Sequence, residues 1–196
     1  MRIRHFLPAA AALVVAACGR GDEGAREADN GLAPETVNVT ADDTANAAES
    51  GPAMAAADFA SAIAASDMYE IESGRLASEK AASAQIKSFG QMLVTDHQKS
   101  TADLKAAASG ARPAVAVMPA MTAEQQQMLD ALRAADAGRF DRLFVEQQKQ
   151  AHQKALATLQ GYASGGDVDA LKTFAAKAAP IVQKHLDQLG TMTPGQ

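Results

Sequence analysis

The sequence predicts an all-α fold, an up-down-up-down four-helix bundle with a short extra helix before the third long helix. Among 196 residues tryptophan is absent, aromatic residues make up 4%, and alanine is very abundant. Such a composition suits closely packed helices better than a β-sandwich. From about Asp58 the apolar residues recur with a period of 3.6. Short links join the predicted long helices in pairs, which makes the two helices of each pair antiparallel.

The first pair consists of helices over roughly 56–81 and 84–109. Ser83 is a suitable N-cap for the second of them. Gly110 and Pro113 are typical of a helix end followed by a loop, so the second helix is expected to stop there.

A short helix is expected next, because Thr122 and Gln125 have the spacing of a capping box. The third long helix covers roughly 138–163. The fourth covers roughly 168–190, with Asp167 as its predicted cap. The inward stripes predicted for the four long helices contain, in chain order, Phe59, Ile63, Glu70 and Ala77; Ile86, Leu93, His97 and Leu104; Phe144, Gln148, His152, Ala155 and Leu159; and Leu171, Phe174, Ala178, Ile181, His185 and Leu189.

Residues 1–18 predict a lipoprotein signal peptide. Arg2 and Arg4 supply positive charge, and the apolar run after them is too short for a permanent transmembrane helix. The run ends in "VAAC", which resembles a bacterial lipobox and makes Cys18 the predicted lipidation site. An ordinary signal peptide with an incidental cysteine is the alternative. Gly19, rather than an aspartate, follows the cysteine, which favours the outer membrane, facing the periplasm.

Residues 19–53 predict a disordered acidic tether, and residues 54–192 the bundle domain. The tether has no helical or strand period and carries eight acidic residues against two arginines. The formal net charge of the chain is −5, and most of this acidity lies in the tether. Because nucleic acid requires a clustered basic face, no nucleic-acid partner is expected.

Three histidines of the predicted bundle, His97, His152 and His185, fall on the apolar stripes of three different helices, and Glu70 falls on the stripe of the first. A residue count along the helices, from the end taken to hold both short turns, puts Glu70, His97 and His152 at one level. The same count puts His185 about 8–10 Å lower, at 1.5 Å per residue.

Spacing leaves two interpretations of these inward polar groups open. They can form a hydrogen-bonded polar layer in which Glu70 sets the protonation of a histidine. They can instead bind one divalent transition metal ion, since imidazole and carboxylate suit zinc, copper or iron. The candidate ligands are then Glu70, His97 and His152, with His185 as a fourth candidate that the depth count places lower.

Two aspartates are candidates for positions behind the ligands, hydrogen-bonded to them. Asp96 adjoins His97 at the edge of its stripe, and Asp141 shares a helix face with His152. Asp96 can alternatively pair with a basic residue or face solvent. Asp141 can alternatively cap the start of the third long helix.

The segments "VTDHQKSTADL", "GRFDRLF" and "FAAKAAPIVQKHL" resemble the bacterial domain-of-unknown-function 4142 family, and the similarity spans about 57–190. The resemblance implies an exported protein, often a lipoprotein, with a ferritin-like helical bundle. The family has no established biochemical activity, so the resemblance implies fold and location rather than function. The positions that match the family's pattern are Glu70, Asp96 with His97, Phe140 with Asp141, His152, and Pro180 with His185.

A ferritin-type di-iron centre is not expected. Such a centre uses two E-x-x-H motifs and two further glutamates. Val94 and Val182 stand three residues before His97 and His185, where those motifs require glutamate. The sequence therefore predicts at most one metal ion with histidine-rich ligation.

Three functions follow from these features. The first hypothesis is a non-catalytic cell-envelope lipoprotein, anchored to the membrane through Cys18, whose bundle binds one zinc, copper or iron ion or an envelope protein partner. The second is a structural or interaction bundle in which a buried layer of histidine and glutamate sets the helix register without metal. The third, a metal-dependent oxidase, is the least favoured. Whether the protein is an enzyme stays open, although no nucleophile or phosphate-loop motif is present.

Overall fold

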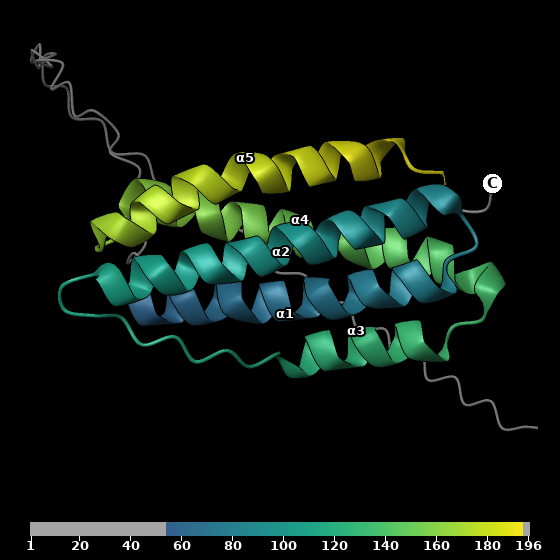
Figure 1. Ribbon diagram of the computed structural model, residues 1–196, viewed down its shortest axis with the longest axis horizontal. Helices are drawn as coiled ribbons and strands as arrows, with labels where there is room; N and C mark the ends of the chain where they lie inside the picture. The colour runs from purple at the N-terminus through teal and green to yellow at the C-terminus, as the bar shows by residue number, and fades with distance from the viewer. Residues whose placement is uncertain (1–53, 194–196) are drawn as a thin grey trace, which may run out of the picture. The chain divides into compact units, whose positions relative to one another are not determined.

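The computed structural model describes residues 54–193, and all regular structure in that range is helical (Figure 1). The predicted signal peptide, Cys18 and the tether lie outside the described residues. No helix within the described range has the length and hydropathy needed to cross a membrane. The helices are α1 (Ala56–Lys80), α2 (Ala84–Gly110), α3 (Ala123–Ala134), α4 (Ala137–Gly165) and α5 (Asp169–Thr191).

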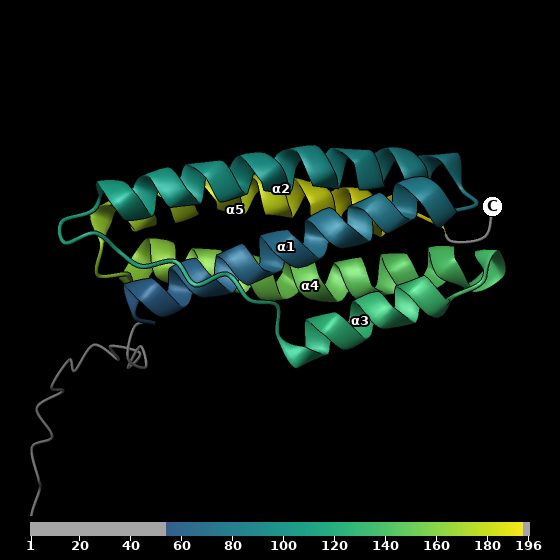
Figure 2. The ribbon, with the colours of Figure 1, turned by 60° about the horizontal axis from the view of Figure 1, so that its bottom comes forward.

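The four long helices form a bundle in which α1 packs mainly on α2, and α4 mainly on α5. The short α3 lies on the outside, against α1 and α4 (Figure 2). The predicted all-α four-helix bundle, with a short extra helix before the third long one, is confirmed.

The order of helix directions differs from the predicted up-down-up-down order. Asp141, near the start of α4, accepts hydrogen bonds from the backbone N–H groups of Ala82 and Ser83 in the α1–α2 turn, at 3.0 and 2.9 Å. The start of α4 therefore lies where α1 ends, and α4 runs parallel to α2. The reason is that the loop after α2, together with α3, carries the chain back along the bundle (Figures 1 and 2). The long helices run up, down, down, up, and their two short turns lie at opposite ends.

Two of the three predicted N-cap residues lie at the predicted positions. Thr122 and Gln125 form the predicted capping box of α3. Ser83 is the N-cap residue of α2, although its side chain makes no capping hydrogen bond. The predicted cap Asp167 is wrong, because Val168 is the N-cap of α5. The Asp167 carboxylate instead accepts a hydrogen bond of 2.9 Å from the Tyr162 hydroxyl.

Close packing of α1 on α2 depends on two facing glycines. A Cβ atom added to Gly74 would lie 2.6 Å from the carbonyl oxygen of Gly90, and a Cβ on Gly90 would lie 2.6 Å from that of Gly74. Both neighbouring atoms belong to backbone and cannot turn aside. The absence of side chains at these two positions therefore sets the separation of the helices.

The core consists of two apolar clusters with a buried polar layer between them. Along each long helix the polar residues come after one cluster and before the other, so the layer crosses the middle of the bundle. The cluster nearer the α4–α5 turn includes Phe59, Ile63, Leu104, Leu159, Tyr162, Leu171 and Phe174. The cluster nearer the α1–α2 turn includes Ile86, Phe89, Leu93, Phe140, Phe144 and Leu189. The polar layer contains Asp67, Glu70, Ser73, His97, Gln147, Gln148, His152 and His185.

The predicted inward stripes are correct except at one position of α5. Ile181 is 46% exposed, whereas its neighbour Val182 is 6% exposed and belongs to the core. Both residues lie three or four positions from Ala178 and His185, so a helical period cannot choose between them. The packing of α5 on its neighbours makes that choice.

Candidate metal centre

Three histidines from three helices meet in the polar layer. His97 of α2, His152 of α4 and His185 of α5 are all buried, and one ring nitrogen of each lies within 4.8 Å of the other two. Their ring centroids are 5.3 to 5.7 Å apart. The prediction that His185 lies 8–10 Å below the other two is therefore wrong. That count assumed that both short turns lie at one end of the bundle, whereas they lie at opposite ends.

The outer nitrogen of each ring faces a group that only accepts hydrogen bonds. His97 Nδ1 lies 2.8 Å from an Asp67 carboxylate oxygen, and His185 Nε2 lies 3.0 Å from an oxygen of Asp96. His152 Nδ1 lies 2.9 Å from the backbone carbonyl oxygen of Gln148. Because ionised carboxylates and carbonyls donate no hydrogen, each of these three ring nitrogens must carry the N–H.

This arrangement leaves the lone pairs of the neutral rings on the inner nitrogens. They are His97 Nε2, His152 Nε2 and His185 Nδ1. His152 Nε2 and His185 Nδ1 lie only 3.2 Å apart. His97 Nε2 is buried and has no hydrogen-bond partner among residues 54–193. Three converging acceptors with no donor between them form a site for a cation, either a proton or a metal ion.

The donor set fits a divalent transition metal. Nitrogen ligands at 2.0–2.1 Å around a tetrahedral ion lie about 3.3 Å from one another, and the separation of His152 Nε2 and His185 Nδ1 is 3.2 Å. All three ligand nitrogens lie within 4.8 Å of one another, so at most a modest inward movement of His97 completes the set. A hydrogen bond from each outer N–H to a carboxylate or carbonyl is the usual support for a metal-binding imidazole.

Glu70 does not belong to the converging group. Its Oε1 atom lies 3.7 Å from His152 Nδ1, which is the outer side of that ring. Neither carboxyl oxygen has a hydrogen-bond partner within the described residues, although the side chain is fully buried. The predicted place of Glu70 among the ligands is thus corrected to a position behind His152. The helical pattern shows that Glu70 faces the interior, but it does not show which side of the His152 ring the carboxyl group faces.

Burial shifts the pKa values of the site residues in the direction that favours the neutral form of each side chain. It raises the pKa of Glu70 to about 8, so this carboxyl holds a proton at neutral pH. Burial, followed by repulsion from His97 and His185, lowers the pKa of His152 to about 3. Burial also lowers the pKa of His185. His97 differs: burial acts to lower its pKa, but the Asp67 hydrogen bond and the nearby acidic groups together raise it.

Asp67 is a site residue that the sequence analysis missed. It lies four residues after Ile63 and three before Glu70, so it falls on the same inward stripe of α1. This spacing was the signal by which the sequence could have identified Asp67 as an inward-facing residue. In the structure Asp67 is buried and accepts hydrogen bonds from His97 and, at 3.1 Å, from the hydroxyl of Thr101.

Comparison with known proteins agrees with the fold. The family model described as a domain of unknown function, DUF4142, matches residues 41–192. The chain belongs to the DUF4142 family. No curated protein matches its sequence. The solved structure of CopM in the Cu(II)-bound form is similar to this DUF4142 protein, with a TM-score of 0.60 and 18% identity, over 71% of this chain and 95% of CopM. At this identity the likeness shows the fold alone.

The two predicted supporting aspartates have different positions in the DUF4142 bundle. Asp96 lies against His185, with its side chain 37% exposed, and so connects the histidine cluster to the surface. Asp141 lies at the end of the bundle, where it binds the N–H groups of the α1–α2 turn. The prediction that Asp141 supports the histidines is wrong, because it precedes His152 by three helical turns and faces a different layer.

Proposed function

We propose that this protein is a non-catalytic cell-envelope protein whose bundle binds one divalent transition metal ion through His97, His152 and His185. The observation that supports this proposal most directly is the convergence of three imidazole lone pairs. A hydrogen-bond acceptor on the outer side of each ring leaves the lone pair on the inner nitrogen. Neutral rings in this arrangement repel one another unless a cation lies between them. A metal ion removes that repulsion at all three nitrogens together.

Copper(II) is the first candidate for the ion. Nitrogen ligand sites generally bind copper(II) more tightly than zinc or iron(II). CopM, which shares the fold, has a Cu(II)-bound form, and this supports testing copper first. Zinc is the second candidate, because it accepts the same imidazole ligands in tetrahedral geometry.

Metal titration of the purified, metal-free chain tests the proposal. We expect one copper(II) per chain by calorimetry, with nitrogen hyperfine structure from imidazoles in the electron paramagnetic resonance (EPR) spectrum. The double variant His97→Ala, His152→Ala is expected to lose this binding. A matched control, Gln150→Ala with Lys154→Ala, changes two exposed side chains of α4 and should bind normally. Equal binding by the histidine variant would place the metal elsewhere.

A metal-free structural layer is the second candidate function. It is favoured by the raised pKa of His97, since a protonated His97 beside the Asp67 carboxylate supplies the cation that the site lacks. In that case the histidines specify the register of the helices and the bundle contacts an envelope partner. The chain would then take up neither copper nor zinc at micromolar concentration.

The proposed location rests on residues 1–18 of the sequence. We expect lipid to be attached at Cys18 and to hold the protein at the outer membrane, facing the periplasm. Labelling of cells with radioactive palmitate tests this expectation. The wild-type chain should carry the label, the Cys18→Ala chain should not, and equal labelling of the two would contradict the anchor.

A further inference from the structure

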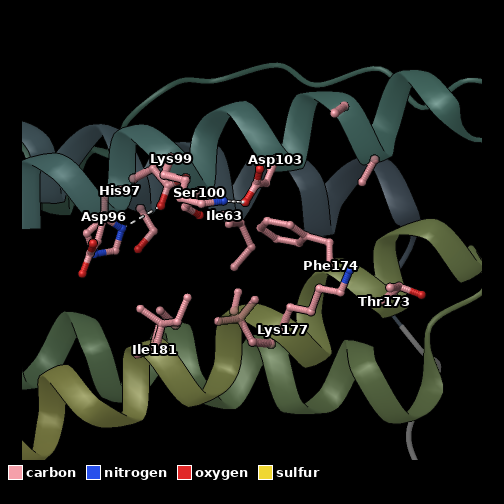
Figure 3. Close-up of a pocket in the computed structure, with 18 of the residues that line it drawn as sticks. Ile63, Asp96, His97, Lys99, Ser100, Asp103, Thr173, Phe174, Lys177 and Ile181 are labelled. Atoms are coloured by element: carbon pink, nitrogen blue, oxygen red, sulfur yellow. Dashed lines mark hydrogen bonds and ion pairs between the residues drawn. The ribbon is translucent and has the colours of Figure 1, made fainter.

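A cavity of about 620 Å³ lies between α2 and α5 and is also lined by α1 and α4. Figure 3 shows Asp96 and His97 at one end of this cavity, with Phe174 and Thr173 toward the other. Its size is within the range of cavities that bind small organic molecules. It is therefore large enough for a ligand considerably bigger than water.

The cavity reaches the histidine cluster on one side. His97 and His185 line it, whereas His152 does not. Three imidazoles fill three positions around a metal ion, and a fourth position is left for water or an external ligand. The cavity touches two of the three rings, but the inner nitrogen of His97 is buried, so side chains of the cluster must shift before a ligand in the cavity reaches the ion.

The side chains that line the cavity favour a ligand with an apolar body. Ile63, Leu159, Phe174 and Val182 line it beyond the histidines, and all four belong to the buried core. Burial of an aromatic ring against such side chains is favourable at about 25 cal/mol for each Å² removed from water.

The charges around the cavity select an uncharged head group. Asp67 and Asp96 bind the outer nitrogens of His97 and His185, so two negative charges already balance a divalent ion. A further anion would add uncompensated charge in a buried site. Lys99 and Asp103 also line the cavity, but they pair with each other. Lys177 is a further lining residue, and in Figure 3 it lies beside Phe174, away from His97. An anionic head would be held at that end.

We propose that the cavity binds a small uncharged nitrogen heterocycle with an apolar body, and that the ring nitrogen occupies the open position of the metal ion. This inference rests on the proposed function, since it requires the ion. It assigns the cavity a ligand class: a neutral nitrogen donor at the histidine end and an aromatic or aliphatic group along α5.

The test compares two probes on the copper-loaded chain. Imidazole offers the nitrogen alone, and 4-phenylimidazole adds a phenyl group that the cavity can bury. We expect both to change the EPR spectrum of copper, and 4-phenylimidazole to bind at least about tenfold more tightly. Benzoate, which has the ring but an anionic head, is expected to leave the copper spectrum unchanged.

A cavity-filling variant separates this site from adventitious coordination. Ala178→Phe places a ring in the cavity, whereas Ala176→Phe adds the same ring at an exposed α5 position that does not line it. We expect Ala178→Phe to keep copper and imidazole binding and to lose the preference for 4-phenylimidazole. Ala176→Phe should keep that preference.

The outcomes distinguish this inference from the proposed function. A chain that takes up neither copper nor zinc overturns both. A chain that binds copper but shows no preference for 4-phenylimidazole overturns the cavity ligand alone. An unchanged preference in Ala178→Phe overturns it as well, and a benzoate effect on the copper spectrum overturns the assigned charge class.

Discussion

His152 Nε2 lies 3.2 Å from His185 Nδ1, and the opposite nitrogen of each ring donates to an acceptor, the Gln148 carbonyl and the Asp96 carboxylate. Two neutral imidazoles in this orientation direct lone pairs at each other. A proton or a metal ion between the two rings removes the repulsion between these lone pairs.

Asp96→Asn should weaken metal binding. An asparagine amide can either donate or accept, so it no longer sets which nitrogen of His185 carries the hydrogen. We expect copper affinity to fall by about 10–100-fold, as is typical for partners behind metal ligands. Chelator competition measures this loss. The control is Asp103→Asn on the same helix, which removes an exposed partner of Lys99. Equal losses in both variants would contradict the role of Asp96.

Glu70→Gln should change how stability depends on pH in the metal-free protein. The pKa of Glu70 is raised from 4.5 to about 8 in the folded state. A raised pKa contributes stability that is complete below 4.5 and is lost as the pH rises through about 8. Between pH 5 and 8 the free energy of unfolding should therefore fall by about 3 kcal/mol more in wild type than in Glu70→Gln.

Urea unfolding at the two pH values measures that difference. The comparison with Glu70→Gln cancels the opposite contributions of His152 and His185, whose lowered pKa values disfavour the folded state in acid. Glu79→Gln, at an exposed position of α1, is the matched control. The same pH dependence in wild type and Glu70→Gln would show that the buried carboxyl is not protonated.

Asp141→Ala should destabilise the bundle without changing its metal stoichiometry. The Asp141 carboxylate accepts hydrogen bonds from the backbone N–H groups of Ala82 and Ser83, and its removal leaves both without that partner. We expect a loss of about 2 kcal/mol in the free energy of unfolding. Chemical denaturation checks it, with exposed Asp130→Ala as the control. A loss of copper binding at unchanged stability would return Asp141 to the metal site.

Gly74→Ala should destabilise the α1–α2 pair. The new Cβ would lie 2.6 Å from the carbonyl oxygen of Gly90, so the helices must separate. We expect a loss of about 1–3 kcal/mol in the free energy of unfolding. Gly161→Ala is the control, because its Cβ meets no atom within 4 Å and alanine favours a helix. A thermal melt should show the first variant less stable than wild type and the second equal or more stable.

The positions of the helices and most of their inward faces could be predicted because they depend on the spacing of apolar residues along a single helix. Phe59, Leu93 and Leu159 were placed correctly for this reason. Ile181 was misplaced because two adjacent residues satisfied the same period. His185 was assigned the wrong depth because its level depends on the path of the loop after α2, and no local pattern specifies that path.

The sequence by itself determined the helices, the buried position of the three histidines and Glu70, and the absence of di-iron motifs, since all of these follow from residue type and spacing along one helix. Only the tertiary structure decided the direction of α4, the meeting of His152 with His185, and the side of the ring on which Glu70 lies. These features depend on how separate helices are rotated and shifted against one another. Long-range packing sets those quantities, as the Asp141 contacts and the facing glycines illustrate.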